Sequence, residues 1–164
     1  MKKTSLCYIE AEGAFLMLLR NKKKHDYNEG KWIGVGGKFE NDETPRECVI
    51  REVLEETGID LADYPETESP REEGLHFYGV ITFCSESLQE DMYLYSAKLP
   101  KRPLGELFCE EGELHWIPKE EVLKLNLWEG DVVFLREMLE GKSCINMTLK
   151  YQNDRLTEVI REKE

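Results

Sequence analysis

The pattern of apolar and polar positions predicts a sheet at the start of the chain. Two strands are expected at Ser5 to Glu10 and at Ala14 to Arg20, with a turn at Glu12 and Gly13 between them. The polar stretch from Asn21 to Lys31 contains glycine and predicts a loop. Trp32 to Gly37 returns to apolar residues and glycines, so we expect a third strand there.

Helical and strand patterns alternate along the rest of the chain. Helical spacing of apolar residues predicts helices at Pro45 to Thr57 and Asp131 to Leu139, with a helical turn at Glu120 to Leu125. Strands are expected at Leu75 to Cys84, Asp91 to Leu99, a segment ending at Trp116, Ser143 to Lys150 and Leu156 to Arg161. The order β-β-β-α-β-β-β-α-β-β predicts an α+β fold, with a sheet flanked by helices.

The composition is that of one ordinary globular domain. Of 164 residues, 40% are hydrophobic and 34% are charged, so we expect one domain over residues 1–164. The net charge of −12 argues against long nucleic acids as partners but leaves room for a small nucleotide arriving with a cation. No signal peptide and no apolar span of ~20 residues is found, so a cytoplasmic protein without a membrane segment is expected.

The five cysteines suggest neither a disulfide framework nor a zinc site, because they are odd in number and form no C-x-x-C pair. Three of them lie in apolar, strand-like runs and are expected to be buried thiols: Cys7, Cys84 and Cys144. The oligomeric state is not indicated by any feature of the sequence.

The helix at Pro45 to Thr57 carries strong start and stop signals. Thr44, followed by Pro45 and Glu47, predicts a capping box, and Gly58 supplies a left-handed residue at the end. At ~100° per residue, its four apolar residues fall within an arc of about 140° and three carboxylates share the far side. The apolar residues are Val49, Ile50, Val53 and Leu54, and the carboxylates are Glu52, Glu55 and Glu56.

Three carboxylates on one helix face repel one another unless a cation lies on them. A solvated acidic face is the commonest origin of such a cluster, and a site for a hard divalent cation such as Mg²⁺ is the alternative. Arg51 lies four residues from Glu47 and from Glu55, so we expect it to pair with both.

The residues around the helix decide in favour of the metal site, because together they resemble the complete signature of the Nudix hydrolase family. The matching string is Gly37, five residues, Glu43, seven residues, Arg51-Glu52-Val53, one residue, Glu55-Glu56, one residue and Gly58-Ile59. The resemblance implies the Nudix fold, a mixed β-sheet flanked by α-helices in an α/β/α sandwich. It also implies hydrolysis of nucleoside diphosphates linked to another group, with Mg²⁺, or Mn²⁺ as the alternative ion.

Carried over to this sequence, the resemblance assigns roles to single residues. Glu52, Glu55 and Glu56 would be metal ligands, one of them doubling as general base, and Gly36 would lend its backbone carbonyl. Arg51 and Glu43 would be structural supports.

Further candidates lie outside the helix. In Nudix proteins an acidic loop before a strand ending in Trp and Pro often supplies another ligand or base, which points to Glu111, with Glu110 and Glu113 as rivals. The basic run Lys22 to Lys24, with Lys23 at its centre, is either solvated surface or a group that attracts phosphates. Lys38 follows the glycines directly and would contact a phosphate as a point charge.

The chain further resembles the MutT-like branch of the family, and within it the animal-type enzymes that hydrolyse oxidised purine nucleoside triphosphates. The resemblance rests on three features: Gly30-Lys31-Trp32 before Gly36-Gly37-Lys38, the segment Leu127-Trp128-Glu129-Gly130-Asp131, and the closing strands. It implies that Trp128 stacks on the base and Asp131 reads the purine edge, with Tyr27 as a further aromatic wall. A helix-start core residue is the alternative interpretation of Trp128.

Two positions depart from this branch, since the position of its base-reading asparagine is Ile33 here and the second of its paired aspartates is Gly130. The function predicted is a Mg²⁺-dependent pyrophosphohydrolase that converts a nucleoside triphosphate to a monophosphate and pyrophosphate, of the 8-oxo-dGTP type. Hydrolysis of ADP-ribose, a dinucleotide or a nucleotide sugar is the rival within the same chemistry. A nucleotide-binding Nudix module without turnover is the rival from another class.

Overall fold

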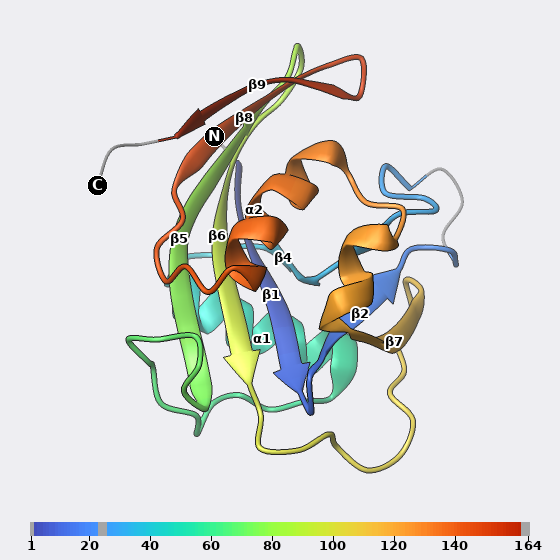
Figure 1. Cartoon of the computed structure of the whole chain (residues 1–164), viewed down its shortest axis with the longest axis vertical. Helices are drawn as coiled ribbons and strands as arrows, with labels where there is room; N and C mark the ends of the chain where they lie inside the picture. The colour runs from blue at the N-terminus through green and yellow to red at the C-terminus, as the bar shows by residue number, and fades with distance from the viewer. Residues whose placement is uncertain (1, 23–25, 162–164) are drawn as a thin grey trace.

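A computed structural model describes residues 2–22 and 26–161 of the chain (Figure 1). The two α-helices are α1 (Pro45–Thr57) and α2 (Glu129–Leu139), and a 3₁₀ helix η1 (Lys119–Lys124) precedes α2. The strands are β1 (Lys2–Ala11), β2 (Ala14–Leu19), β3 (Trp32–Ile33), β4 (Val35–Lys38), β5 (Gly74–Cys84), β6 (Gln89–Lys98), β7 (Glu113–Pro118), β8 (Met147–Gln152) and β9 (Arg155–Arg161).

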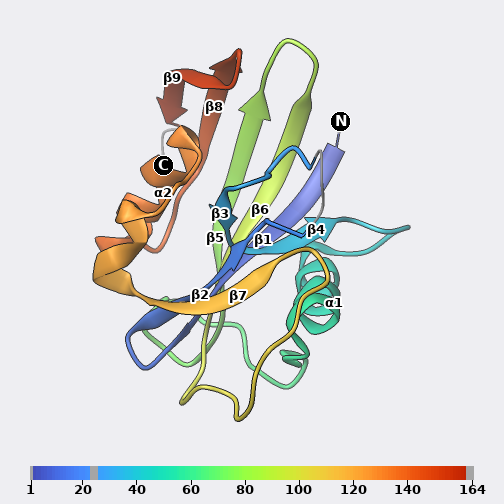
Figure 2. The same ribbon diagram turned by 90° about the vertical axis from the view of Figure 1, so that its right-hand side faces the viewer.

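The described strands form one mixed sheet with a helix on each side. Its main path runs β3-β2-β1-β6-β5-β8-β9, while β4 pairs with β1 and β7 pairs with β2. The pairs β1·β6 and β5·β8 are parallel, and the other pairs are antiparallel. Figure 2 shows α1 on one side of the sheet and α2 on the other. The predicted α/β/α sandwich is thus confirmed.

Two hydrophobic clusters fill the layers. One is packed against α2 and contains Tyr8, Met17, Ile81, Phe134 and Leu135, among others. The other is packed against α1 and contains Ile9, Leu16, Val49, Val53 and Leu75, among others. Neighbouring residues of one strand, such as Tyr8 and Ile9, enter opposite clusters because side chains alternate across a sheet.

The third strand is two short strands rather than one. β3 pairs with β2, β4 pairs with β1, and Gly34 lies between the two segments. A Cβ at Gly34 would lie 2.9 Å from the carbonyl oxygen of Cys7 and 3.1 Å from the Tyr8 ring, so a side chain there would collide with β1. The chain therefore crosses from one partner strand to the next at a residue without a side chain.

The predicted bounds of α1 are confirmed by its caps. Thr44 Oγ1 accepts from the backbone N–H of Glu47, the Glu47 carboxylate accepts from the N–H of Thr44, and Gly58 takes φ 80°. The apolar face is rotated from the predicted one, since Leu54 is 45% exposed whereas Cys48 is fully buried. Leu54 was assigned to the core wrongly because periodicity gives the centre of a face and not its edges.

Two other expectations need correction. α2 begins at Glu129 rather than at Asp131, with Trp128 in the N-cap position. Of the three cysteines expected to be buried, Cys7 is buried, Cys84 is intermediate and Cys144 is exposed. Cys144 lies before β8 in an irregular segment, so the alternation of a strand does not apply to it.

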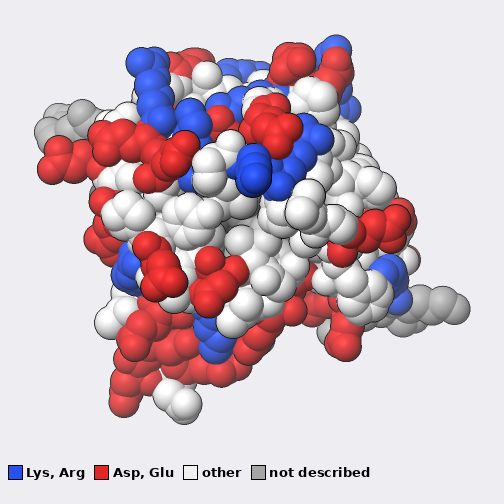
Figure 3. Space-filling model, turned by 90° about the horizontal axis from the view of Figure 1, so that it is seen from below, with Lys and Arg blue, Asp and Glu red and all other residues white. Residues whose placement is uncertain are grey.

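The surface agrees with the acidic composition. The view from below in Figure 3 shows acidic side chains forming a broad area along one edge, with Lys and Arg gathered toward the opposite edge. No helix among the described residues combines the length and apolar character that crossing a membrane requires.

Candidate active site

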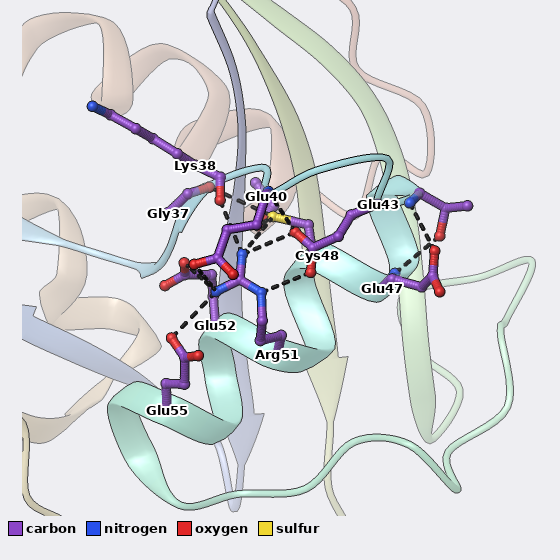
Figure 4. Close-up of polar contacts among 11 residues, drawn as sticks. Gly37, Lys38, Glu40, Glu43, Glu47, Cys48, Arg51, Glu52 and Glu55 are labelled. Atoms are coloured by element: carbon purple, nitrogen blue, oxygen red, sulfur yellow. Dashed lines mark hydrogen bonds and ion pairs between the residues drawn. The ribbon is translucent and has the colours of Figure 1, made fainter.

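The Arg51 guanidinium is the centre of the polar network on α1 (Figure 4). It donates to both carboxylate oxygens of Glu43, at 2.7 and 2.9 Å, and to Glu52 at 2.8 Å. It also donates to Glu55 at 3.2 Å and to the backbone carbonyl of Lys38 at 3.0 Å. Arg51 thereby ties the loop before α1 to two of the three clustered glutamates.

The expected pair between Arg51 and Glu55 is present, but the expected pair with Glu47 is not. The Glu47 carboxylate closes the capping box by accepting from Thr44 N at 2.9 Å, and Glu43 takes the place beside Arg51. Hydrogen bonding to the arginine lowers the pKa of Glu43 below its ordinary value. In Figure 4 the side chain of Lys38 points away from the carboxylates, leaving only its carbonyl in the network.

Glu52 lies directly against the glycine-containing strand β4. A Cβ at Gly37 would lie 2.5 Å from the carboxyl carbon of Glu52, so the backbone approaches this carboxylate where no side chain intervenes. Burial raises the pKa of Glu52 above its ordinary value, and hydrogen bonding to Arg51 opposes that rise. The carboxylate is therefore held between an arginine and bare backbone.

Glu56 is the most perturbed carboxyl group of the helix. Burial, and after it the negative charges of Glu111 and Glu52, raise its pKa to about 8, against the opposing effects of Arg20 and the backbone N–H of Gly36. Its Oε2 atom is buried without a hydrogen-bond partner among the described residues. A buried carboxylate oxygen without a donor calls for a proton or a cation.

Glu111 reaches this group from the loop before β7. Its charge acts on Glu56, and its carboxylate forms an ion pair of 3.1 Å with Arg20. Among the rivals, Glu113 instead pairs with Asn21 and with His115 at 3.3 Å. The structure thus brings Glu111, rather than Glu113, to the carboxylates of α1.

These carboxylates fit a hard divalent cation. Within residues 2–22 and 26–161, no three His, Cys, Asp or Glu side chains form a ready-made metal site. Yet Glu52 and Glu111 both repel Glu56, which has an oxygen without a partner, and Gly36 packs so tightly on β1 that a Cβ would lie 2.0 Å from the Ser5 carbonyl oxygen. Carboxylate and carbonyl oxygens are the donors that Mg²⁺ prefers.

An aromatic platform has assembled around Trp128, at the start of α2. The Tyr27 ring stacks on the indole with centroids 5.0 Å apart and planes 15° apart, and Tyr151 lies 6.1 Å away. The indole N–H donates to Asn28 Oδ1 at 2.7 Å, and Lys31 Nζ lies 4.8 Å from the ring centroid. We call Tyr27, Asn28, Trp128 and Tyr151 the aromatic platform.

Tyr27 is a wall of this platform, as expected, but it leaves no gap beside the indole. A base between two rings needs them roughly 7 Å apart, twice the van der Waals separation of carbon atoms. At 5.0 Å, Tyr27 occupies the place that a base would take on that face of Trp128. The Tyr27 ring must therefore move if a base stacks on that face.

Asp131 lies in the first turn of α2, close enough to Tyr151 of the platform for its charge to act on that residue, and is only 6% exposed. Burial raises its pKa to about 7, with Lys31 lowering it and Glu90 raising it. The departure at Gly130 has a structural reason, because a Cβ there would lie 2.6 Å from the Tyr151 hydroxyl, which accepts from Gly130 N at 2.6 Å. The space of a side chain at position 130 is thus filled by Tyr151.

Some sequence-based candidates cannot be placed, and some neighbours were missed. Lys23 lies outside the described residues. Arg20, Asp26, Asn28 and Tyr151 were not identified from the sequence. Only Arg20 carries a signal, as a charge at the end of an apolar strand that becomes only 13% exposed.

Comparison with known proteins agrees with this geometry. Residues 2–138 match the model of the NUDIX domain family. An uncharacterised Nudix hydrolase of Bacillus subtilis is 26% identical over 158 residues, which is 92% of this chain and 87% of that protein. A Danio rerio protein named oxidized purine nucleoside triphosphate hydrolase is 27% identical over 127 residues, covering 76% of this chain and 73% of that one.

The fold has close counterparts among solved structures. The crystal structure of a MutT protein from Bacillus halodurans superimposes with a TM-score of 0.79 at 24% identity, covering 100% of this chain and 99% of that one. A MutT protein from Methanosarcina mazei gives a TM-score of 0.65 at 25% identity, covering 85% and 92%. The chain therefore belongs to the Nudix family and is a hydrolase that acts on pyrophosphate bonds.

Proposed function

We propose that this Nudix hydrolase is a Mg²⁺-dependent nucleoside triphosphate pyrophosphohydrolase for oxidised purine nucleotides of the 8-oxo-dGTP type. Nudix hydrolases act on small nucleotides and generally use a divalent metal ion. The observation that carries the proposal is the buried carboxyl group of Asp131 beside the aromatic platform around Trp128. The Danio rerio relative is named for the same activity.

The platform and Asp131 have the chemistry to bind a purine. An indole face stacks on any base and contributes about 1–3 kcal/mol, but stacking alone does not select. With a pKa of about 7, Asp131 is populated both as an acid and as a carboxylate near neutral pH. It can therefore donate to a purine carbonyl or accept from a purine N–H, and a lost partner at such a buried group is costly.

The carboxylates of α1 have the chemistry to support hydrolysis. A divalent ion held by Glu52, Glu55, Glu56, Glu111 and the Gly36 carbonyl would neutralise charge on the phosphates and acidify bound water. Water is the nucleophile: its oxygen forms a new P–O bond, the phosphoanhydride bond between the α- and β-phosphates breaks, and the products are a nucleoside monophosphate and pyrophosphate. One carboxylate of this cluster, which we take to be Glu56, would accept the proton from the attacking water. Arg51 holds Glu52 and Glu55 in place.

The proposed donors fit Mg²⁺, the ion that the resemblance implies. All of them are oxygen atoms, which suit hard divalent cations. Mn²⁺ would occupy the same oxygens and serve as a substitute.

The test is release of pyrophosphate and phosphate from a panel of nucleotides with Mg²⁺ and with Mn²⁺. The panel contains 8-oxo-dGTP, the ordinary dNTPs, ADP-ribose and diadenosine polyphosphates. Preference for 8-oxo-dGTP with pyrophosphate as product would support the proposal. Equal turnover of all dNTPs would remove the oxidised purine from it while keeping the reaction.

A second candidate function is hydrolysis of a nucleoside diphosphate linked to a larger group, such as ADP-ribose. A cavity of about 470 Å³ favours it, since Cys109 and Gly112, which flank the segment of Glu111 in the chain, line this cavity, and it would accommodate a second moiety beyond the diphosphate. It lies between β2, β7 and the preceding loop, and its lining includes Lys22, Phe108, His115 and Trp116. Preference for ADP-ribose in the panel would select this candidate.

A further inference from the structure

Arg20 lies between the two halves of the candidate site. Its Nε atom is 2.6 Å from Asp26 Oδ2, and its Nη1 atom is 3.1 Å from Glu111 Oε2. The Arg20 and Asp26 side chains are only 13% and 10% exposed, whereas Glu111 is 38% exposed. One buried cation is therefore shared between two carboxylates that belong to different parts of the site.

On one side, Arg20 holds the loop of the aromatic platform. Asp26 is followed directly by Tyr27, which stacks on Trp128, and by Asn28, which accepts from the indole N–H. The backbone of Arg20 is bonded to the same loop, accepting from Gly30 N at 2.8 Å and donating to the Lys31 carbonyl at 3.0 Å. Arg20 is thus connected, through its ion pair with Asp26 and two backbone hydrogen bonds, to the residues that contact Trp128.

On the other side, Arg20 holds a proposed metal ligand. Glu111 is close enough to Glu56 for their charges to interact. A divalent cation on these carboxylates would compete with Arg20 for Glu111. Once Glu111 turns to the cation, Arg20 has Asp26 as its remaining carboxylate partner. Its charge then interacts with one carboxylate instead of two, so the ion pair between Arg20 and Asp26 becomes stronger.

We propose that Arg20 is a positioning residue that couples the metal carboxylates to the aromatic platform through Glu111 and Asp26. A cation bound at Glu111 frees Arg20 to fix Asp26, and this orders Tyr27 and Asn28 against one side of Trp128, so that the base stacks on the opposite face of the indole. The coupling rests on the proposed function, because it assumes a metal at Glu111 and a base at Trp128. By linkage, a base at the platform must strengthen cation binding by the same factor.

The first test measures Mn²⁺ affinity by calorimetry without any nucleotide. Arg20→Gln removes the competing cation, so Mn²⁺ should bind about three- to tenfold more tightly. Asp26→Asn leaves Arg20 entirely to Glu111, so Mn²⁺ should bind more weakly by a similar factor. Lys22→Gln is the matched control, since it removes a positive charge from the same region while Lys22 contacts the Cys109 carbonyl rather than a carboxylate.

These three variants separate the proposal from general electrostatics. A change of less than twofold in Lys22→Gln, with opposite shifts in the other two, supports it. Equal gains in Lys22→Gln and Arg20→Gln, or no shift in Asp26→Asn, overturn it. If Arg20→Gln does not fold, the double variant Arg20→Gln with Asp26→Asn removes both buried charges and replaces it.

The second test measures coupling with the nucleoside 8-oxo-2′-deoxyguanosine, which has no phosphate and so cannot touch the metal itself. In the unaltered protein, Mn²⁺ should raise the affinity for the nucleoside about fivefold or more. The factor should fall below twofold in the double variant and be partly kept in Arg20→Lys. No coupling in the unaltered protein, or unchanged coupling in the double variant, overturns the proposal.

The two tests also distinguish failure of the inference from failure of the proposed function. A nucleoside that does not bind with or without Mn²⁺ removes the base site at Trp128 and, with it, the claim that coupling reaches a base. The Mn²⁺ measurements still report whether Arg20 competes for Glu111. Absence of Mn²⁺ binding in every variant would instead contradict the metal site and overturn the coupling with it.

Discussion

The carboxylate face of α1 and the aromatic platform are built in opposite ways. The network around Arg51 draws on residues between Lys38 and Glu55, so no partner lies more than thirteen positions from Arg51. In the platform, by contrast, Trp128 bonds Asn28 across 100 positions and Gly130 bonds Tyr151 across 21. The first region depends on one helix and the turn before it, whereas the second depends on the whole sheet being folded.

Removing a charge from the helix face should have the largest effect. Glu56→Gln keeps the size of the side chain but loses the proton acceptor and a metal ligand, so kcat should fall about 10²- to 10⁴-fold. The fold should be intact, because the helix caps and the core are untouched. Steady-state hydrolysis and circular dichroism measure the two effects, and near-normal turnover would contradict the role of Glu56.

The platform side should show its buried charge in the dependence of stability on pH. Burial raises the pKa of Asp131 to about 7, from an ordinary value of 3.8. Between these values the folded protein keeps a proton that the unfolded chain has released, so this group makes stability fall as pH rises through the window. At ~1.4 kcal/mol per pKa unit, the loss amounts to about 4 kcal/mol at most.

The control for this effect is Asp131→Asn, which cannot titrate. Its stability relative to the unaltered protein should rise between about pH 4 and pH 7 and stay constant above that range. Urea unfolding at several pH values measures the free energy of unfolding of both proteins. Other titrating groups, such as Glu56, are present in both, so their contribution cancels in the difference. A difference that does not change with pH would mean that Asp131 is charged in the folded protein.

How far the sequence predicts each region follows from this contrast. The bounds of α1, its capping box and the pair between Arg51 and Glu55 were predicted because each depends on residues within one or two turns. Glu43 displaced Glu47 from Arg51 because the capping box already uses the Glu47 carboxylate. The capping box and the pairing with Arg51 both require the Glu47 carboxylate. Residue spacing allows either contact, and only the three-dimensional geometry decides between them.

The platform was predicted only in part, and only through resemblance. Trp128, Tyr27 and Asp131 were identified, but nothing in the order of residues indicates that Tyr27 lies on Trp128 or that Tyr151 fills the space at Gly130. Arg20 and Asp26 were missed for the same reason, since their ion pair meets Glu111 from a loop some 90 positions away along the chain. Such contacts exist only once the sheet has placed its loops side by side.

A smaller effect should come from the platform itself. Trp128→Ala removes the indole face and should weaken binding of a nucleoside monophosphate by about 1–3 kcal/mol, without a comparable loss of Mn²⁺ binding. Phe108→Ala is the matched control, because Phe108 is a 70% exposed aromatic residue that lines the 470 Å³ cavity of the second candidate function. A larger loss from Phe108→Ala than from Trp128→Ala would favour the second candidate function.

The smallest effect should separate the folding signals of the helix stretch from its chemistry. Thr44 Oγ1 accepts from Glu47 N at 3.1 Å, and Thr44→Ala removes this cap while leaving every carboxylate of the site in place. The free energy of unfolding should drop by about 1 kcal/mol, which for a chain of this size corresponds to about 2–4 °C in Tm. Thr44→Ser keeps the hydroxyl and should recover most of the loss. Because packing of its buried face, as well as the cap, stabilises α1, the helix should stay folded in the variant at 25 °C. We therefore expect kcat to stay within about twofold of its normal value. A tenfold drop in kcat would show that the cap also positions the carboxylates, and the local signals of this stretch could then not be divided into those for folding and those for catalysis.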